Sequence, residues 1–279
     1  MNKRKNISGL CKHANMTRQN YYSLRKSRTK NRIDKDFILF LIRNERKVQP
    51  RIGTRKLHKI IEDDLSRNNI KIGRDRLFDV LRSESMLIEK KKAFTPKTTD
   101  SKGNLKNYIN LLELYEPTAP NHVWVSDITY IRTEEGFVYA CLVTDLFSRK
   151  IVGAHIGDTM KAKDVLKALN MAIKTLPKNK FPIHHSDRGS QYYSKKYTKR
   201  LKRRGLSISL TGDNHCYDNA VAERVNGILK DEYNLDMTFN TKKDAYRALW
   251  NAVEIYNTRR PHMSLNYQIP GNVHMDNVA

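Results

Sequence analysis

The sequence predicts a chain in two parts, a small all-α region followed by a mixed α/β sheet with helices on its faces. Three observations support this fold class. Apolar residues recur at helical spacing through the first ninety residues. A polar segment then interrupts the pattern, and beyond it β-branched and aromatic runs indicate strands that alternate with amphipathic helices. A length of 279 residues also fits two domains of roughly 150 residues each.

The charge is high and unevenly distributed. Lys and Arg number 53 against 29 Asp and Glu, a formal net charge of +24. Residues 1–110 hold 29 basic and 11 acidic side chains, a net +18, whereas residues 111–279 carry only +6. This excess predicts a polyanionic partner. The hydrophobic content of 39% is too high for a disordered basic tail, so the chain is expected to bury a core.

Several classes of protein are excluded. Cys11, Cys141 and Cys216 show no pairing or ligand spacing, which argues against a disulfide framework and a Cys-based zinc site. We find no window of 18 apolar residues, no signal peptide, no P-loop and no GxGxxG. We therefore expect a cytoplasmic protein with no membrane partner.

The first ninety residues are expected to form short helices. In residues 1–48 the pattern is broken around a candidate N-cap, Thr17, and becomes clear from Asp34 to Val48. Residues 49–88 hold two short basic helices around a tight connection, which predicts a helix-turn-helix. Its second helix, near Gly73 to Leu87, would place Arg74 and Arg76 against DNA bases or phosphates. A generic helical bundle with solvated basic side chains explains this pattern equally well.

Residues 89–107 are rich in Lys, Thr, Ser, Gly and Pro and are expected to be a linker. After it, residues 108–270 are assigned to a second domain and residues 271–279 to a tail. The order of elements is βββαβαβαα, and the first three strands form an antiparallel meander. The expected strands are residues 122–132, 137–147, 150–158, 182–186 and 206–211. The expected helices are residues 161–176, 194–204, 218–234 and 241–258.

Three carboxylates stand out in this second domain. Asp127 interrupts an apolar strand, and Asp187 directly follows a strand, where open mixed sheets place ligands. Glu223 shares the polar face of its helix with Asn219, Asn226 and Lys230. Taken singly, each has an ordinary explanation: a satisfied strand Asp, an Asx-turn and a solvated helix Glu. Together they would suit two hard divalent cations that assist an in-line phosphoryl displacement.

The segments around these carboxylates carry a recognisable signature. They are SDITY at 126–130, HSDRGSQY at 185–192 and CYDNAVAERVNGILKDE at 216–232, supported by VTDLFSRKIVG at 143–153 and IYNTRRPHMSLNYQIP at 255–270. The signature resembles the retroviral-integrase-like transposases, and most of all the insertion sequence 3 family of bacterial transposases. Residues 50–88 are similar to that family's small helix-turn-helix module.

The resemblance implies a ribonuclease H-like fold in which Asp127, Asp187 and Glu223 are the catalytic ligands of two Mg²⁺ or Mn²⁺ ions. It implies a DDE transposase that binds double-stranded DNA at element ends, cleaves a phosphodiester and transfers the exposed 3′-OH to another strand. The route would be copy-out, paste-in, through a circular intermediate joined end to end, with a homo-oligomer on DNA in the bacterial nucleoid. Asn219 and Lys230 match positions beside the third carboxylate, where they would touch the DNA end or form an ordinary polar face.

The chain also departs from its relatives. Cys11, His13 and His58 lack the paired His and Cys spacing of retroviral integrases, so no zinc domain is expected. Family members are often produced as a fusion with an upstream-frame partner protein, and this sequence shows no heptad run of its own. Whether the chain is the whole active species therefore stays open.

The segment 195–205 supplies a further candidate DNA surface. Seven Lys and Arg surround Tyr197 and Leu201, so the helix can anchor its apolar side and direct Lys195, Lys199 and Arg203 toward phosphates. Simple solvation is the alternative. Two rival functions also remain, a catalytically silent DNA-binding regulator and a ribonuclease H-like nuclease that only hydrolyses. The intact triad argues against the first, and the basic helical N-terminal region argues against the second.

Overall fold

The computed structural model describes residues 7–89, 108–113, 115–212 and 219–276. It divides the chain into two compact units. One comprises Met1–Val48 with Leu57–Leu87, and the other comprises Gln49–Lys56 with Ile88–Ala279. Most of the expected linker, residues 90–107, falls outside the described residues. Within these ranges, no helix combines the length and the apolar character needed to cross a membrane.

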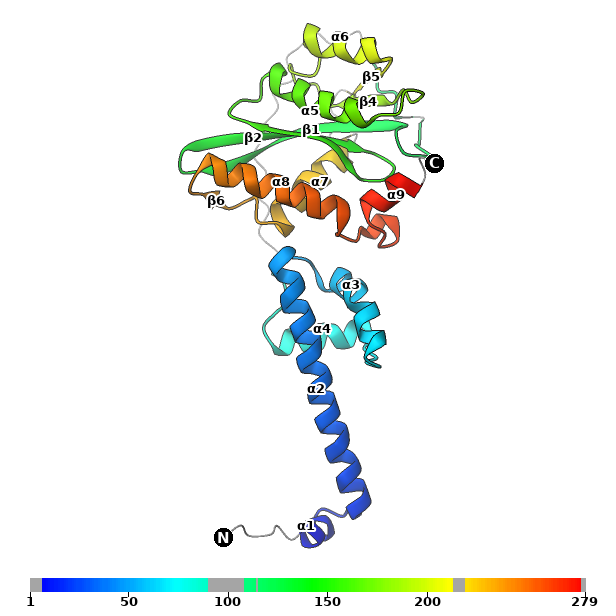
Figure 1. Ribbon diagram of the computed structural model, residues 1–279, viewed down its shortest axis with the longest axis vertical. Helices are drawn as coiled ribbons and strands as arrows, with labels where there is room; N and C mark the ends of the chain where they lie inside the picture. The colour runs from blue at the N-terminus through cyan, green and yellow to red at the C-terminus, as the bar shows by residue number, and fades with distance from the viewer. Residues whose placement is uncertain (1–6, 90–107, 114, 213–218, 277–279) are drawn as a thin grey trace. The chain divides into compact units, whose positions relative to one another are not determined.

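The helical unit is built around one long helix. Its elements are α1 (Ile7–His13), α2 (Arg18–Val48), all but the first three residues of α3 (Thr54–Arg67), and α4 (Arg74–Ser83). Only the C-terminal half of α2 contributes buried apolar side chains to this unit, from Ile38, Leu39 and Ile42, and α3 and α4 lie beside that half (Figure 1). The expected helices on either side of the tight connection are confirmed. The candidate N-cap Thr17 is confirmed, because its Oγ1 accepts the backbone N–H of Asn20 at the start of α2. The expectation of short helices is wrong here, because α2 runs without a break for 31 residues.

The second unit is organised by a mixed sheet. Its order is β3-β2-β1-β4-β5, with β6 also paired to β1. The strands are β1 (Val123–Thr133), β2 (Gly136–Asp145), β3 (Ile151–Gly157), β4 (Ile183–Ser186), β5 (Ser207–Leu210) and β6 (Thr238–Phe239). Strands β1 to β3 form the predicted antiparallel meander, and β4 and β5 continue the sheet in parallel. The fold class predicted from the sequence is therefore confirmed.

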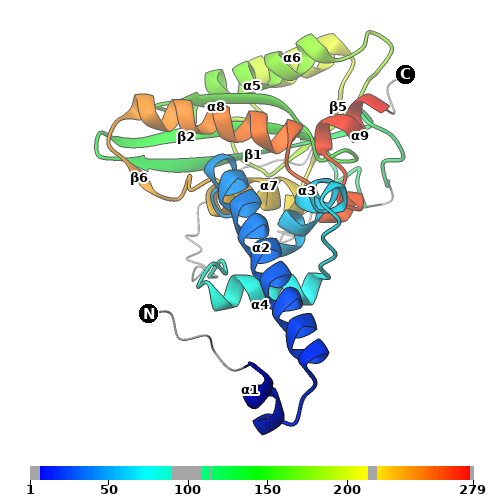
Figure 2. The same cartoon turned by 60° about the horizontal axis from the view of Figure 1, so that its bottom comes forward.

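Helices cover both faces of this sheet (Figures 1 and 2). One face carries α5 (Ala162–Thr175) and α6 (Lys195–Arg204), and the other carries α7 (Ala220–Glu232) and α8 (Lys242–Thr258). A core of buried apolar side chains from β1, β2, α5 and α6 includes Trp124, Val143, Leu169 and Leu201. Burial of this apolar area holds β1 as the central strand of the sheet.

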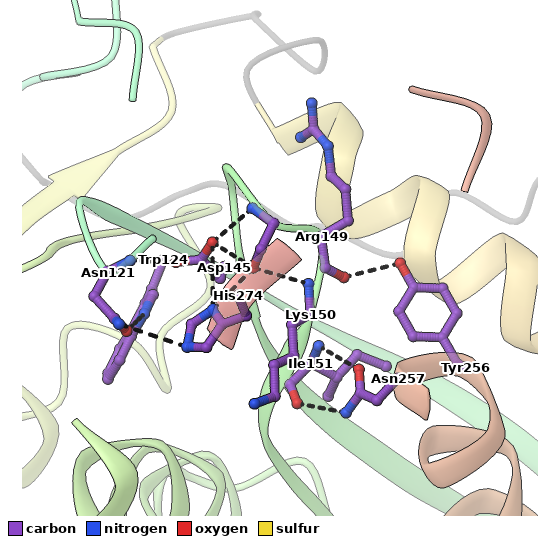
Figure 3. Close-up of polar contacts among 10 residues, drawn as sticks. Asn121, Trp124, Asp145, Arg149, Lys150, Ile151, Tyr256, Asn257 and His274 are labelled. Atoms are coloured by element: carbon purple, nitrogen blue, oxygen red, sulfur yellow. Dashed lines mark hydrogen bonds and ion pairs between the residues drawn. The ribbon is translucent and has the colours of Figure 1, made fainter. Parts of the chain in front are cut away.

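The C-terminal segment packs against the end of the sheet near the turn before β3 (Figure 3). Residues expected to form a tail instead begin a helix, α9 (Pro270–Asp276), whose His274 Nδ1 lies 2.9 Å from Ser148 Oγ. Buried Asp145 accepts hydrogen bonds from Ser148 and from the backbone N–H of Asn121. In α8, the Asn257 side chain bonds both the N–H and the C=O of Ile151. These contacts satisfy backbone groups at the edge of the sheet.

The segment Gln49–Lys56 packs in the second unit against the C-terminal end of α7. Glu232 accepts hydrogen bonds from Lys56 Nζ (2.7 Å) and from Arg260 Nε and Nη2 (2.7 and 2.8 Å). The backbone N–H of Arg51 donates to the Glu232 carbonyl. Arg260 is 2% exposed, so Glu232 compensates a cation that has lost its water.

Candidate active site

Strand register places the first two carboxylates side by side. In the parallel pair β1 and β4, Ser126 lies opposite Ser186. Asp127 and Asp187 are the next residues along each strand path, and β4 ends at Ser186. Asp187 therefore emerges at the carboxyl end of β4 next to Asp127. The Asp187 Oδ1 accepts a hydrogen bond from the backbone N–H of Gly189 (3.0 Å), which fixes the side chain at the start of the loop.

Helix α7 and its N-cap residue Asn219 are hydrogen-bonded to β1 at Asp127 and at the residue before it. The Asn226 Nδ2 donates to Asp127 Oδ2 at 2.8 Å, and the Asn219 Nδ2 donates to the Ser126 carbonyl at 3.2 Å. The other Asp127 oxygen accepts the backbone N–H of Ile128. Asn219 and Asn226 are 4% and 5% exposed, whereas Glu223, between them in the first turn of α7, is exposed.

Burial and neighbouring negative charge raise the pKa values of the two aspartates. Burial raises the pKa of Asp127 to about 7, and the negative charges of Asp187 and, to a smaller extent, Glu223 add to this rise. Burial likewise raises the pKa of Asp187, against the hydrogen bond from Gly189. Carboxyls whose pKa is raised by burial, and in Asp127 also by neighbouring carboxylates, are candidates for a functional site.

The residues beneath the carboxylates belong to the core. His184 Nε2 lies 2.9 Å from Ser126 Oγ and 2.8 Å from Tyr197 Oη, and burial lowers the pKa of this imidazole to about 3. His184 is therefore neutral near pH 7. His185 Nδ1 lies 2.8 Å from Ser209 Oγ on β5. Tyr192 is 2% exposed, and the nearby charges of Asp127 and Asp187 add to the effect of burial in raising its pKa.

The expected DNA contacts occupy different environments. Lys230 is half-buried with Nζ 4.1 Å from the centre of the Tyr130 ring, and burial lowers its pKa. Asn219, expected beside the DNA end, instead turns inward to Ser126. On α6, Tyr197 and Leu201 are buried as expected, and the exposed row comprises Lys195, Lys199 and Arg203. In the helical unit, Arg74 and Arg76 are exposed on α4, and Arg74 Nε lies 2.8 Å from Asp75 Oδ1.

The geometry brings Asp127 and Asp187 together and leaves Glu223 further out. Among the described residues, no group of three His, Cys, Asp or Glu side chains is assembled tightly enough to hold a metal ion. The donor set nevertheless suits a hard cation. Burial raises the pKa of both half-buried carboxyls, the charge of Asp187 adds to the rise at Asp127, and a divalent cation would offset both effects. The role of Asn226 was not predicted from the sequence. Its position on the polar face with Glu223 was the available signal.

An antiparallel meander joined to parallel strands, with helices on both faces and carboxylates on β1, after β4 and on α7, defines the integrase-type core on a ribonuclease H-like fold. Two models described as "Integrase core domain" match residues 117–216 and 204–270. The catalytic core of HTLV-2 integrase, solved in complex with magnesium, is similar at 19% identity and a TM-score of 0.46. This match covers 57% of this chain and 99% of that one.

Similarity to curated relatives extends to the helical unit. The chain is 36% identical over 260 residues to the insertion element IS600 31 kDa protein of Shigella sonnei, covering 92% of this chain and 94% of that protein. It is 35% identical to transposase InsF of insertion sequence IS3A of Escherichia coli, over 65% of this chain and 64% of that one. The chain belongs to the insertion sequence 3 family of transposases, the DDE enzymes with an integrase core.

Proposed function

We propose that this transposase cleaves one DNA strand at each end of its insertion sequence and joins the exposed 3′-OH to a second strand. The observation that carries this proposal is the position of Asp127 on β1 next to Asp187, which directly follows the adjacent parallel strand β4, with α7 bonded to Asp127 by Asn226. Glu223 lies three residues before Asn226 on α7, so a modest movement of its exposed side chain would complete the triad.

In this mechanism the protein supplies position and charge. Asp127, Asp187 and Glu223 would hold two Mg²⁺ or Mn²⁺ ions, which supply activation of the attacking oxygen and stabilisation of the leaving oxygen. The Asn226 side-chain amide donates to the Oδ2 of Asp127 and so keeps this carboxylate oriented for both reactions. Both steps replace one oxygen of a phosphodiester by another in line, so a single set of carboxylates serves hydrolysis and strand transfer.

Two sets of cations fit the DNA partner. Lys230 lies two turns beyond Glu223 on α7 and is suited to a phosphate near the reacting end. Lys195, Lys199 and Arg203 recur every four residues on the exposed side of α6 and so are suited to track a phosphate backbone. We assign Asn219 to positioning β1 rather than to the DNA surface. Joining two ends in one event also favours a homo-oligomer on DNA.

The metal requirement tests this proposal. On labelled duplexes that carry the element ends, Mg²⁺ and Mn²⁺ should support both cleavage and joining. Ca²⁺ should support assembly without chemistry, because its looser and higher coordination misplaces the attacking oxygen. The products are resolved on denaturing gels and the assembly on native gels. Activity that persists undiminished in chelator would contradict the mechanism.

The Asn226 contact provides a second test. Replacing Asn226 with Ala removes the hydrogen bond that orients Asp127, so the cleavage rate should fall by about 10–100-fold. The Mg²⁺ concentration that gives half-maximal cleavage should rise. DNA binding should not change. The matched control is Asn251→Ala, which removes an exposed amide from α8 and should retain full activity. If the Asn226 variant keeps the Mg²⁺ dependence of the native chain, then this residue does not position Asp127.

A further inference from the structure

The exposed N-terminal half of α2 carries a concentration of positive charge that the integrase core does not explain. Residues 1–33 contain ten Lys and Arg and no Asp or Glu. Helices α3 and α4 together contain seven basic and five acidic residues, so their net charge is far smaller. More than half of the net +18 of residues 1–110 therefore lies before Asp34, and little of it lies in α4, where the sequence pattern placed DNA recognition.

The local geometry here is a helix, a tight turn and a second helix. Helix α1 ends at His13, Asn15 adopts a left-handed conformation with φ 49°, and the N–H of Met16 bonds the Cys11 carbonyl. Thr17 caps α2, because its Oγ1 accepts the backbone N–H of Asn20. The buried side chain of Cys11 lies in α1, which packs against α2. Figure 1 shows this pair at the start of the chain.

One face of α2 gathers the residues suited to DNA. At roughly 100° per residue, Arg18, Gln19, Tyr22, Arg25, Lys26 and Lys30 fall within an arc of about 140°. Among the described residues, only α1 packs against this half of α2, and its side chains are otherwise exposed. The exposed fraction of Tyr22 is 45%. A shallow surface recess on the same face is bordered by Tyr22, Arg25, Lys26, Thr29, Lys30 and Ile33. A second copy of this helix would repeat the same positive charge, so charge complementarity favours DNA.

We propose that residues 7–33 form a second, sequence-reading DNA-binding element, with the first turn of α2 in the major groove. Arg18 and Gln19 are at the start of the second helix, where helix-turn-helix proteins contact base edges, and these residue types pair with guanine and adenine. Arg25, Lys26 and Lys30 follow along the same face and contact phosphates. The inference rests on the proposed function, because it assigns the recognition of element ends to this element.

The experiment begins with selection of preferred duplexes from a random-sequence pool by the full chain. Affinities for a selected and a scrambled duplex are then measured across a salt titration. Arg18→Lys keeps the charge but loses the bidentate fork, so the preference for the selected duplex should fall by about tenfold with an unchanged salt slope. The triple variant Arg25→Ala, Lys26→Ala, Lys30→Ala should weaken both duplexes alike and flatten the slope by about 2.7.

Two controls separate the outcomes. Arg28→Ala removes a cation from the far side of α2 and should retain the preference. The double variant Arg74→Ala, Arg76→Ala tests the rival location on α4. Loss of preference in this double variant, with full preference in Arg18→Lys, would overturn the inference while cleavage by the native chain still supported the proposed function. If the triple variant changed its oligomeric state and bound DNA as the native chain does, the inference would be overturned. A second copy of the chain would then be the occupant of this face.

Discussion

Replacing Asp187 with Asn is expected to reduce strand cleavage and joining by more than about a thousandfold, while binding to end DNA is retained or strengthened. Loss of a single preorganised electrostatic contact already costs about 10²–10³ in rate, and this change removes a full charge from the pair with Asp127. The amide oxygen can still accept the N–H of Gly189, so the local loop is preserved. DNA affinity does not suffer, because the change removes a negative charge beside the phosphate.

The measurement compares both activities on the same labelled end DNA in Mg²⁺. The control is Asp231→Asn, which neutralises an exposed carboxylate near the end of α7 and should leave cleavage within about twofold of the native rate. Equal loss of binding and cleavage in the Asp187 variant would mean that this residue is structural. Full cleavage in the same variant would show that strand cleavage does not use this carboxylate.

The sequence predicted the sheet and its first two carboxylates because these depend on local pattern. Asp127 is a charged residue within an apolar strand, and Asp187 directly follows a segment predicted to be a strand. Each residue can therefore be recognised from its immediate neighbours in the sequence. Their adjacency follows from the register of Ser126 with Ser186, which a parallel pair of these two strands makes natural. The contact of Asn226 with Asp127 depends on how α7 packs against β1, which helical spacing alone does not define.

The long helix α2 was missed for a physical reason. Helical patterns are read from an apolar stripe, and the first half of α2 buries almost no side chain, so it offers no stripe. The tail prediction failed similarly at α9, a helix of seven residues that a few contacts fix, among them that of His274 with Ser148. Both errors concern elements whose placement depends on polar contacts or exposure rather than on apolar periodicity.

The largest stability effect is expected at Glu232. Replacing Glu232 with Gln leaves Arg260, which is 2% exposed, and Lys56 without their shared anion. Breaking a buried ion pair from one side costs about 3–5 kcal/mol, which corresponds to a fall in Tm of roughly 10 °C. Glu232 ends the helix that carries Glu223, so unfolding near Glu232 would also lower activity. Cleavage is therefore measured well below the Tm of the variant, where loss of stability no longer affects it. Asp158→Asn, which breaks the more exposed pair with Lys242, should change Tm little.

The dependence of this effect on pH has a defined sign. Burial opposes ionisation of Glu232, but the hydrogen bond and charge of Arg260, with the charge of Lys56, hold its pKa below the usual 4.5. A carboxyl with a depressed folded pKa contributes stability above its unfolded pKa and loses it as pH falls through the folded value. The gap in Tm between the native chain and Glu232→Gln should therefore be full at pH 7 and should narrow below 4.5, as the native carboxylate also becomes neutral. Thermal unfolding followed by circular dichroism at pH 7, 5 and about 3.5 measures this gap. A gap that is small at pH 7, or that widens as the pH falls, would show that Glu232 does not stabilise the fold through its charge.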